Sequence, residues 1–209
     1  MLAPLAADRE TVRPTKHVSE DGQFDLRKEN RMRRLLIVTL MFGMVGTGAS
    51  AQAPSPQKPG AEQKKLEAFV GTWTYIGEAK QNPYGPAGKI TGTDVYEMLP
   101  GGFFLTHHWD EKNPIGNLKG VETWGYDSEK KSYAYNYYTS FGEMGSGAIT
   151  VTGNMWRFTS SGIAFDGKRA WSRCTASFAG AASFTVKCDA SADGKTWATD
   201  VFQGTWTKK

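Results

Sequence analysis

The sequence predicts an all-β domain, an antiparallel up-and-down barrel of about 8–10 strands with a short N-terminal helical turn. From Phe69 onward, short runs of β-branched and aromatic residues alternate with turns that contain Gly, Pro, Asn or Asp. Helical periodicity in this part of the chain is confined to one apolar turn formed by Leu66, Phe69 and Val70. A parallel sheet with crossover helices is therefore not expected.

The first and last strands contain the same short motif. Gly71-Thr72-Trp73-Thr74 opens the first strand, and Gly204-Thr205-Trp206-Thr207 ends a strand predicted from Trp197 to Trp206. We attribute the likeness to shared strand chemistry, because no period recurs between the two motifs. An up-and-down barrel closes by pairing its last strand with its first, so we expect these two strands to be neighbours.

The N-terminal region has the features of an export signal. Arg31, Arg33 and Arg34 form a basic region, Leu35 to Val45 an apolar one, and Ala49-Ser50-Ala51 a small-residue cleavage site. A membrane anchor is the alternative, but a spanning helix needs about twenty apolar residues. We therefore expect a periplasmic or secreted protein that has no stable membrane span after signal cleavage.

This interpretation divides the chain into four parts. Residues 1–31 are interpreted as an upstream extension of the gene model or a disordered segment, because a signal normally begins at its basic region. Residues 32–51 are the signal peptide, and residues 52–65, rich in Pro, Gln and Ser, a flexible linker. Residues 66–209 form one barrel domain, which is long enough for a single core.

The charge balance does not indicate a nucleic-acid partner. The whole chain has 25 Lys and Arg against 21 Asp and Glu, and residues 1–51 contain eight of the former and six of the latter. The remaining 17 basic residues, against 15 acidic ones, are scattered along the sequence. A nucleic-acid-binding face would need them clustered.

Three turns set the expected strand registers, because a turn fixes which residues face each other across a hairpin. The turns are Pro100-Gly101, Asn113 to Gly116 and Asp127 to Lys130. The first turn predicts the pairs Met98–Phe103, Tyr96–Leu105 and Asp94–His107. The second predicts Asp110–Lys119, Leu105–Trp124 and His107–Glu122, and the third predicts Trp124–Tyr133 and Glu122–Tyr135.

Because side chains alternate between the two faces of a strand, these registers define an inner and an outer surface. The inner surface is aromatic and consists of Tyr96, Met98, Phe103, Leu105, Trp109, Trp124, Tyr126, Tyr133, Tyr135 and Tyr137. The outer surface is polar, and on it Asp110 faces Lys119 as an expected exposed ion pair. An inner wall so rich in Tyr and Trp indicates a cavity rather than a solid aliphatic core.

Asp94, His107 and Glu122 lie on three neighbouring strands of the predicted inner surface. The two carboxylates favour the charged imidazole, whereas burial opposes it. Such a group can hold the polar end of a ligand or move a proton, and the alternative is a hydrogen-bond network that braces the barrel. A metal site is not favoured, because one His with two carboxylates lacks a second His and no metal-binding motif is present. His108 is expected to face solvent.

Arg173 is a second candidate for binding a ligand. The Asp166-Gly167 hairpin signal places it on one face with Trp156, Phe158 and Trp171. An Arg inside a barrel could hold a carboxylate through two hydrogen bonds. The alternative is a surface Arg or an ion pair with Asp189 on the next strand.

Cys174 and Cys188 flank the turn at Ala179 to Ala182 almost symmetrically. A register centred on Ala181 places them directly opposite each other, at a separation that a disulfide can span. Disulfides form in the oxidising compartments that exported proteins reach. We therefore predict a structural cross-strand disulfide rather than a reactive thiol.

Four motifs resemble known families. Phe69-Val70-Gly71-Thr72-Trp73 is similar to the Gly-x-Trp opening of lipocalins and fatty-acid-binding proteins. Together with Leu99 to Phe104, Trp124 to Asp127 and Ser191 to Trp197, it resembles a bacterial exported family of unknown function with a lipocalin-like, calycin-type barrel. The resemblance implies this fold and a tendency to bind small apolar molecules. It implies no reaction, and the other conserved lipocalin blocks, and with them retinoid or bilin ligands, are not indicated.

The principal functional hypothesis is an exported protein that binds a small hydrophobic or amphipathic ligand without a cofactor. The apolar part of the ligand would contact Trp109, Trp124 and Tyr133, and its polar end His107 and Glu122. The full predicted set is Asp94, Tyr96, Leu105, His107, Trp109, Glu122, Trp124, Tyr133, Tyr135 and Arg173. The alternative is an isomerase or hydrolase in which His107, aligned by Asp94 and Glu122, is the general acid or base.

Overall fold

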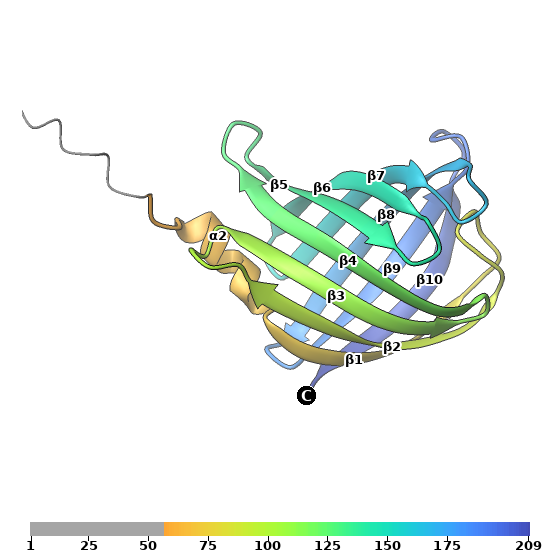
Figure 1. Ribbon diagram of the computed structural model, residues 1–209, viewed down its shortest axis with the longest axis horizontal. Helices are drawn as coiled ribbons and strands as arrows, with labels where there is room; N and C mark the ends of the chain where they lie inside the picture. The colour runs from red at the N-terminus through yellow and green to blue at the C-terminus, as the bar shows by residue number, and fades with distance from the viewer. Residues whose placement is uncertain (1–56) are drawn as a thin grey trace, which may run out of the picture. The chain divides into compact units, whose positions relative to one another are not determined.

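The computed structural model describes residues 57–209, which form a closed antiparallel β-barrel (Figure 1). The expected extension at residues 1–31, the signal peptide at 32–51 and the first residues of the linker lie outside the described residues. The elements are, in chain order, α2 (Ala61–Lys65), the 3-10 helix η1 (Leu66–Ala68), β1 (Gly71–Ala79), β2 (Gly88–Met98), β3 (Phe104–Asn113), β4 (Gly116–Asp127), β5 (Ser132–Thr139), β6 (Met144–Thr152), β7 (Met155–Ile163), β8 (Arg169–Gly180), β9 (Ser183–Ser191) and β10 (Ala198–Lys208).

The strand order confirms the predicted up-and-down barrel. Each strand pairs with the strands before and after it in sequence, and β10 closes the barrel by pairing with β1. In this closing pair Tyr75 lies opposite Trp206, and Gly77 opposite Gly204. No helix within residues 57–209 is long and apolar enough to span a membrane.

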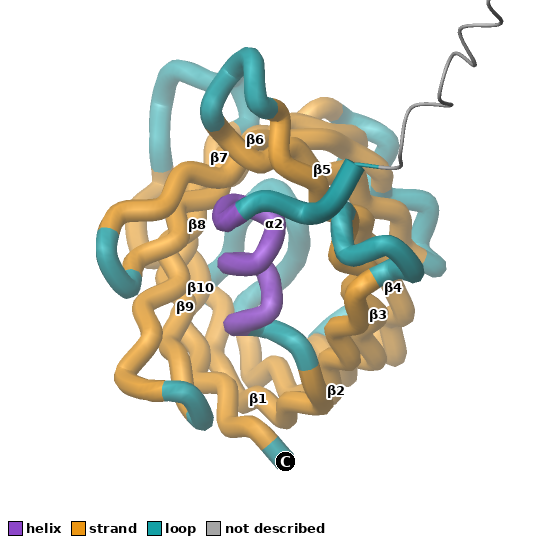
Figure 2. The backbone as a smooth tube through the Cα atoms, turned by 90° about the vertical axis from the view of Figure 1, so that its left-hand side faces the viewer, coloured by secondary structure: helices purple, strands orange, loops and turns teal. Residues whose placement is uncertain are grey.

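The short helices α2 and η1 close one end of the barrel (Figure 2). Leu66 and Phe69 are buried there, and the Trp73 Nε1–H donates a hydrogen bond of 2.6 Å to the Phe69 carbonyl oxygen. The Phe69 ring lies 4.9 to 5.6 Å, between centroids, from the rings of Tyr96, Trp124, Trp156, Phe178 and Phe184. This aromatic contact holds the apolar turn in the end of the barrel.

The helix begins before the predicted domain boundary. Residues 52–65 were expected to be a flexible linker, but Ala61–Lys65 are helical. The Gly60 backbone N–H donates to Gln63 Oε1 at 2.9 Å, and the Tyr133 hydroxyl donates to the Glu62 carbonyl oxygen at 2.9 Å. The second contact comes from a strand that is far away in the sequence, so the composition of residues 52–65 could not predict it.

The hairpin at Asn113 to Gly116 has the predicted register, with His107 opposite Glu122 and Asp110 opposite Lys119. The other two predicted registers are wrong by two residues. Each of these turns is longer than expected: Gly101 and Gly102 both take positive φ in one, and Lys131 does so in the other. The observed pairs that replace the predicted ones are Met98–Leu105, Tyr96–His107, Asp94–Trp109, Trp124–Tyr135 and Glu122–Tyr137.

A shift of two residues leaves every side chain on its predicted face. Tyr96, Leu105, Trp124, Tyr133 and Tyr135 are therefore buried as expected. Phe103 lies in the β2–β3 connection rather than in a strand. On the outer surface His108 is exposed, and Asp110 Oδ2 lies 2.7 Å from Lys119 Nζ as predicted.

The β7–β8 hairpin differs from its predicted register by an odd number of residues. Residues 164–168 form the connection instead of Asp166-Gly167 alone, so Phe158 lies opposite Cys174 and Arg173 opposite Thr159. A shift of one residue moves a whole strand to the other face. Arg173 and Trp171 are consequently on the outer face, and the prediction that they share a face with Trp156 and Phe158 is wrong.

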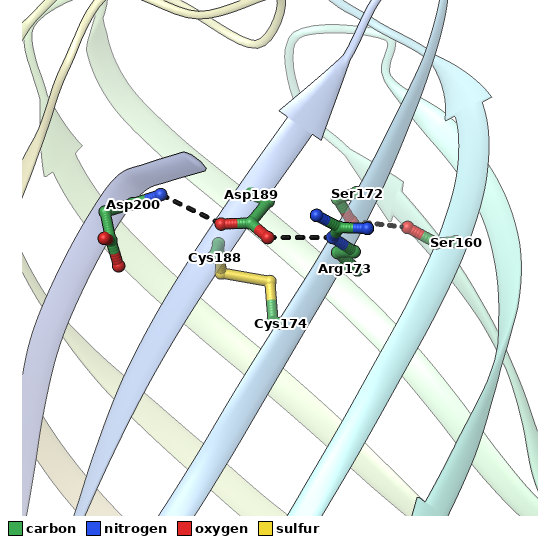
Figure 3. Close-up of a disulfide and its surroundings, with 7 residues drawn as sticks. All are labelled: Ser160, Ser172, Arg173, Cys174, Cys188, Asp189 and Asp200. Carbon is green, nitrogen blue, oxygen red and sulfur yellow. Dashed lines mark hydrogen bonds and ion pairs between the residues drawn. A yellow bond between two sulfur atoms is a disulfide. The ribbon is translucent and has the colours of Figure 1, made fainter. Parts of the chain in front are cut away.

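Cys174 and Cys188 lie directly opposite each other and form the predicted disulfide (Figure 3). Beside it on the outer face, Arg173 Nε donates to Asp189 Oδ2 at 2.8 Å, and the Arg173 guanidinium carbon lies 4.3 Å from the Trp197 ring centroid. The surface ion pair considered for Arg173 is thus the one observed.

We predict that Phe69→Ala lowers the free energy of unfolding by about 3–5 kcal/mol, because it removes a buried ring and leaves a cavity at the closed end. Phe104→Ala is the matched control, since the Phe104 ring is 50% exposed on the outer face. It should change stability by about 0.5 kcal/mol or less. Urea denaturation followed by tryptophan fluorescence measures both; equal losses would contradict the role given to Phe69.

Candidate functional site

The barrel encloses a cavity of about 400 Å³. Phe69 and Phe184 border it on the side of the closed end, and the β1–β2, β3–β4 and β5–β6 connections surround it on the other through residues such as Pro86, Pro114 and Phe141. Cavities of roughly 300–1,000 Å³ hold small organic ligands in other proteins. The interior is therefore solid near α2 and hollow beyond Phe69.

Seven of the ten residues predicted to contact a ligand line this cavity. They are Asp94, Tyr96, His107, Trp109, Glu122, Trp124 and Tyr135. Leu105 and Tyr133 point inward but are almost fully buried in the packed part of the barrel, where the Tyr133 hydroxyl contacts Glu62 near the helix. Arg173 lies outside, with its side chain 46% exposed.

Further cavity residues were not in the predicted set. Tyr75 and Trp206, on the two strands that close the barrel, and Glu111 on β3 all line the cavity. Glu111 lies four residues after His107, so extending the alternation along β3 would have placed it inside. Tyr84 and Glu143 belong to connections between strands, where alternation gives no signal.

His107 lies between the two predicted carboxylates. Its Nδ1 is 3.1 Å from Glu122 Oε2, and its Nε2 is 3.4 Å from Asp94 Oδ2. The first contact has hydrogen-bond geometry, whereas the second is a charge contact without good alignment. The structure thus brings the predicted group together, although Asp94 lies opposite Trp109 rather than opposite His107.

Two tryptophans fix the carboxylates of this group. Trp206 Nε1–H donates to Asp94 Oδ2 at 2.6 Å, and Trp124 Nε1–H donates to Glu122 Oε2 at 2.7 Å. The Tyr96 hydroxyl also donates to Asp94 Oδ2, at 3.3 Å. These hydrogen bonds hold both carboxylates in place beside the imidazole.

The imidazole is stacked against two aromatic rings. The Tyr96 ring lies 4.0 Å from it between centroids at an interplanar angle of 9°, and the Trp109 ring 5.0 Å from it at 28°. Burial, the largest single influence, lowers the pKa of His107, but the nearby carboxylates of Asp94 and Glu122 outweigh it and raise this pKa to about 9. At neutral pH the ring is therefore an imidazolium, which acts as a donor rather than as a base.

Two buried polar atoms of this group have no hydrogen-bond partner among residues 57–209: Asp94 Oδ1 and His107 Nε2. Asp94 is only 2% exposed, and its side chain lines the cavity. A buried acceptor without a donor is costly to folding unless something else satisfies it. These atoms are the points at which a bound molecule could form hydrogen bonds.

A second group of carboxylates lies among the connections at the other side of the cavity. Glu111 accepts hydrogen bonds from the Tyr75 hydroxyl at 2.6 Å and from Asn113 Nδ2 at 2.8 Å. Glu143 is buried and accepts from the Thr139 hydroxyl at 3.1 Å. Burial raises the pKa of Glu143, and the charge of Glu111 contributes to this increase. No group of His, Cys, Asp and Glu within residues 57–209 has the arrangement of a metal site.

The closed barrel, its helical closure and its aromatic interior define an up-and-down β-barrel domain with a lipocalin-like fold. The chain belongs to the DUF1579 family of proteins of unknown function, whose pattern it matches over residues 58–207. No curated protein matches the sequence.

Solved structures with a similar fold are distant in sequence. Rv2717c from M. tuberculosis has 14% identity and a TM-score of 0.54, over 72% of this chain and 98% of that one. The S-type phycobiliprotein lyase CPES from Guillardia theta has 10% identity and a TM-score of 0.48, over 71% and 92%. A fluorescence-activating β-barrel designed de novo has 13% identity and a TM-score of 0.38, over 69% and 96%. Of these three similarities, the one to Rv2717c supports the barrel fold.

We predict that the stability of the protein falls as the pH rises from about 6.5 to about 9, the ordinary and the folded-state pKa of His107. In this window the folded protein retains a proton that the unfolded chain has released, so the free energy of unfolding decreases as the pH rises. Each tenfold difference in proton affinity corresponds to about 1.4 kcal/mol.

Urea denaturation at closely spaced pH values measures this effect, and NMR of the His107 ring locates the titration. His107→Gln should remove most of the slope, whereas His108→Gln, on the exposed outer face of the same strand, should retain it. A wild-type stability that is flat or rises across the window would contradict the assignment of an imidazolium.

Proposed function

We propose that the protein binds a small hydrophobic or amphipathic molecule inside the barrel. The observation that carries this proposal is the cavity of about 400 Å³, which has aromatic walls and a polar group on one side. Ligand sites combine these features, because apolar walls supply affinity and a few polar atoms fix orientation. The apolar part would contact Trp109, Trp124 and Phe158, and the polar part Asp94, His107 and Glu122.

We further propose that binding takes place outside the cytoplasm, in the periplasm or after secretion. The Cys174–Cys188 disulfide supports this location, because such bonds persist mainly in oxidising compartments. The signal-like composition of residues 32–51 supports it independently.

An isomerase is the second candidate function. His107 Nε2 lies 3.4 Å from the Asp94 carboxylate. Neither this nitrogen nor Asp94 Oδ1 has a hydrogen-bond partner within residues 57–209, so a ligand could contact an acceptor and a donor together. Moving a proton from one ligand atom to another needs a base and an acid in this relation. A hydrolase has less support, because no nucleophile adjoins His107 in the contacts described above.

Native mass spectrometry of the protein isolated from its own cells should reveal a co-purifying small molecule. Ser160→Phe places a ring in the cavity and should abolish retention of this molecule, because Ser160 lines the cavity wall. Thr159→Phe is the matched control, since the neighbouring side chain points outward on the same strand. An empty barrel that also fails to bind a panel of lipids and aromatic compounds would contradict the proposal.

His107→Ala distinguishes binding from catalysis. For a binding protein we expect affinity to fall about tenfold, the usual cost of losing one charged hydrogen bond. For an isomerase, turnover should vanish while the ligand still binds. His108→Ala should change neither quantity. A large loss of thermal stability with no change in affinity would instead show that His107 only braces the barrel.

A further inference from the structure

The charged residues of the cavity are nearly all acidic. Glu111, Glu122, Glu143 and Asp94 line it, and His107 is the only basic residue among its lining residues. Asp189 also borders the cavity, but its carboxylate pairs with Arg173 on the outer face. None of the lysines or arginines in residues 57–209 lines the cavity.

The inner group contains more acidic than basic side chains. Two carboxylates, Asp94 and Glu122, flank one imidazolium. Asp94 lines the cavity, and its buried Oδ1 accepts no hydrogen bond within the described part of the chain. A carboxylate oxygen without a donor favours a donor that carries positive charge, because charge-assisted hydrogen bonds are about twice as strong as neutral ones.

The outer group is acidic without compensation. Glu111 and Glu143 accept hydrogen bonds only from neutral donors in the contacts observed, namely Tyr75, Asn113 and Thr139. Neither carboxylate has an ion pair within 4.0 Å in residues 57–209, although exposed carboxylates such as Asp110 do. Charges that line a partly enclosed cavity act through a medium of lower polarity than water, so their sign selects the ligand.

The walls suit the same class of ligand. The tyrosine and tryptophan rings that surround the acidic groups, among them Tyr75, Trp109 and Trp206, present electron-rich faces. Such faces attract organic cations by cation–π interaction. An anionic ligand would gain only the contact with His107, and it would approach several carboxylates.

We propose that the ligand is an organic cation, an amine with an apolar body, whose ammonium group donates a hydrogen bond to Asp94 Oδ1. Glu111 and Glu143 attract the cation as it enters through the connections, and Trp109, Trp124 and Phe158 contact its apolar body. This inference rests on the proposed binding function, because it specifies the class of molecule that occupies the same cavity.

Three probes with the same apolar body test the inference. Octylamine is cationic at pH 7, 1-octanol is neutral and octanoate is anionic, and binding of each is followed by tryptophan fluorescence and calorimetry. We expect octylamine to bind about tenfold more tightly than octanol, the usual gain from one charge-assisted hydrogen bond, and octanoate to bind least.

Conservative variants identify the carboxylate that is responsible for the preference for octylamine. Asp94→Asn should weaken octylamine binding about tenfold and leave octanol binding unchanged. Because Asp94 also accepts a hydrogen bond from Trp206, Glu111→Gln provides a second variant that is less coupled to the core and should weaken octylamine selectively. Asp110→Asn is the matched control, since the adjacent carboxylate lies on the outer face and pairs with Lys119.

The outcomes separate this inference from the proposed function. If octanol or octanoate binds as tightly as octylamine, the cavity binds small molecules but the ligand is not selected by positive charge. The same conclusion follows if Asp110→Asn weakens octylamine as much as Glu111→Gln does. If none of the three probes binds, the inference is contradicted, whereas the binding function is contradicted only if the barrel is also empty as isolated and fails the panel of lipids and aromatic compounds.

Discussion

The packing of the Phe69 ring against the five rings around it is the contact on which the interior of the barrel depends. A barrel of eight strands is just filled by its own side chains, and ten strands enclose more space. Phe69 enters this space from the N-terminal segment and fills one part of it with aromatic contacts. The remaining volume is left as a cavity, so the same residue closes the barrel and sets the depth of the candidate site.

Charge and packing are coupled in the cavity wall. Trp124 and Trp206 belong to the aromatic core, and their indole N–H groups hold Glu122 and Asp94. The carboxylates in turn keep His107 protonated, and Tyr96 and Trp109 stack on its ring. A buried ion pair stabilises a fold only when its remaining hydrogen bonds are satisfied. Here Asp94 Oδ1 has no donor within residues 57–209, so the protein's own groups in this part of the chain do not fully satisfy the network.

The alternation of side chains made much of the site predictable from the sequence. Two turns are longer than their residues indicate, yet shifts of two residues kept Tyr96, His107 and Trp124 on the inner face. In the β7–β8 hairpin the predicted register is wrong by an odd number of residues, so Arg173 lies on the surface rather than in the expected interior. The residues of a turn can indicate where it lies without fixing its length. Whether that length is odd or even decides on which face of the sheet the side chains of the next strand lie.

Other features could not be found by alternation. Glu143 and Tyr84 reach the cavity from connections, where no periodicity applies. The helix that begins at Ala61 is held by Tyr133, which lies 71 residues away from Glu62 in sequence. Contacts at such separation depend on the closed barrel and leave no local pattern.

The position of the disulfide links the occupancy of the barrel to its redox chemistry. Cys174 and Cys188 are on the inner face, and both line the cavity. A dissolved thiol must therefore enter the barrel to attack either sulfur from this side, since exchange requires direct access to the bond. A molecule that fills the cavity shields the sulfurs, and the rate at which a reductant opens this bond becomes a measure of whether the barrel is occupied.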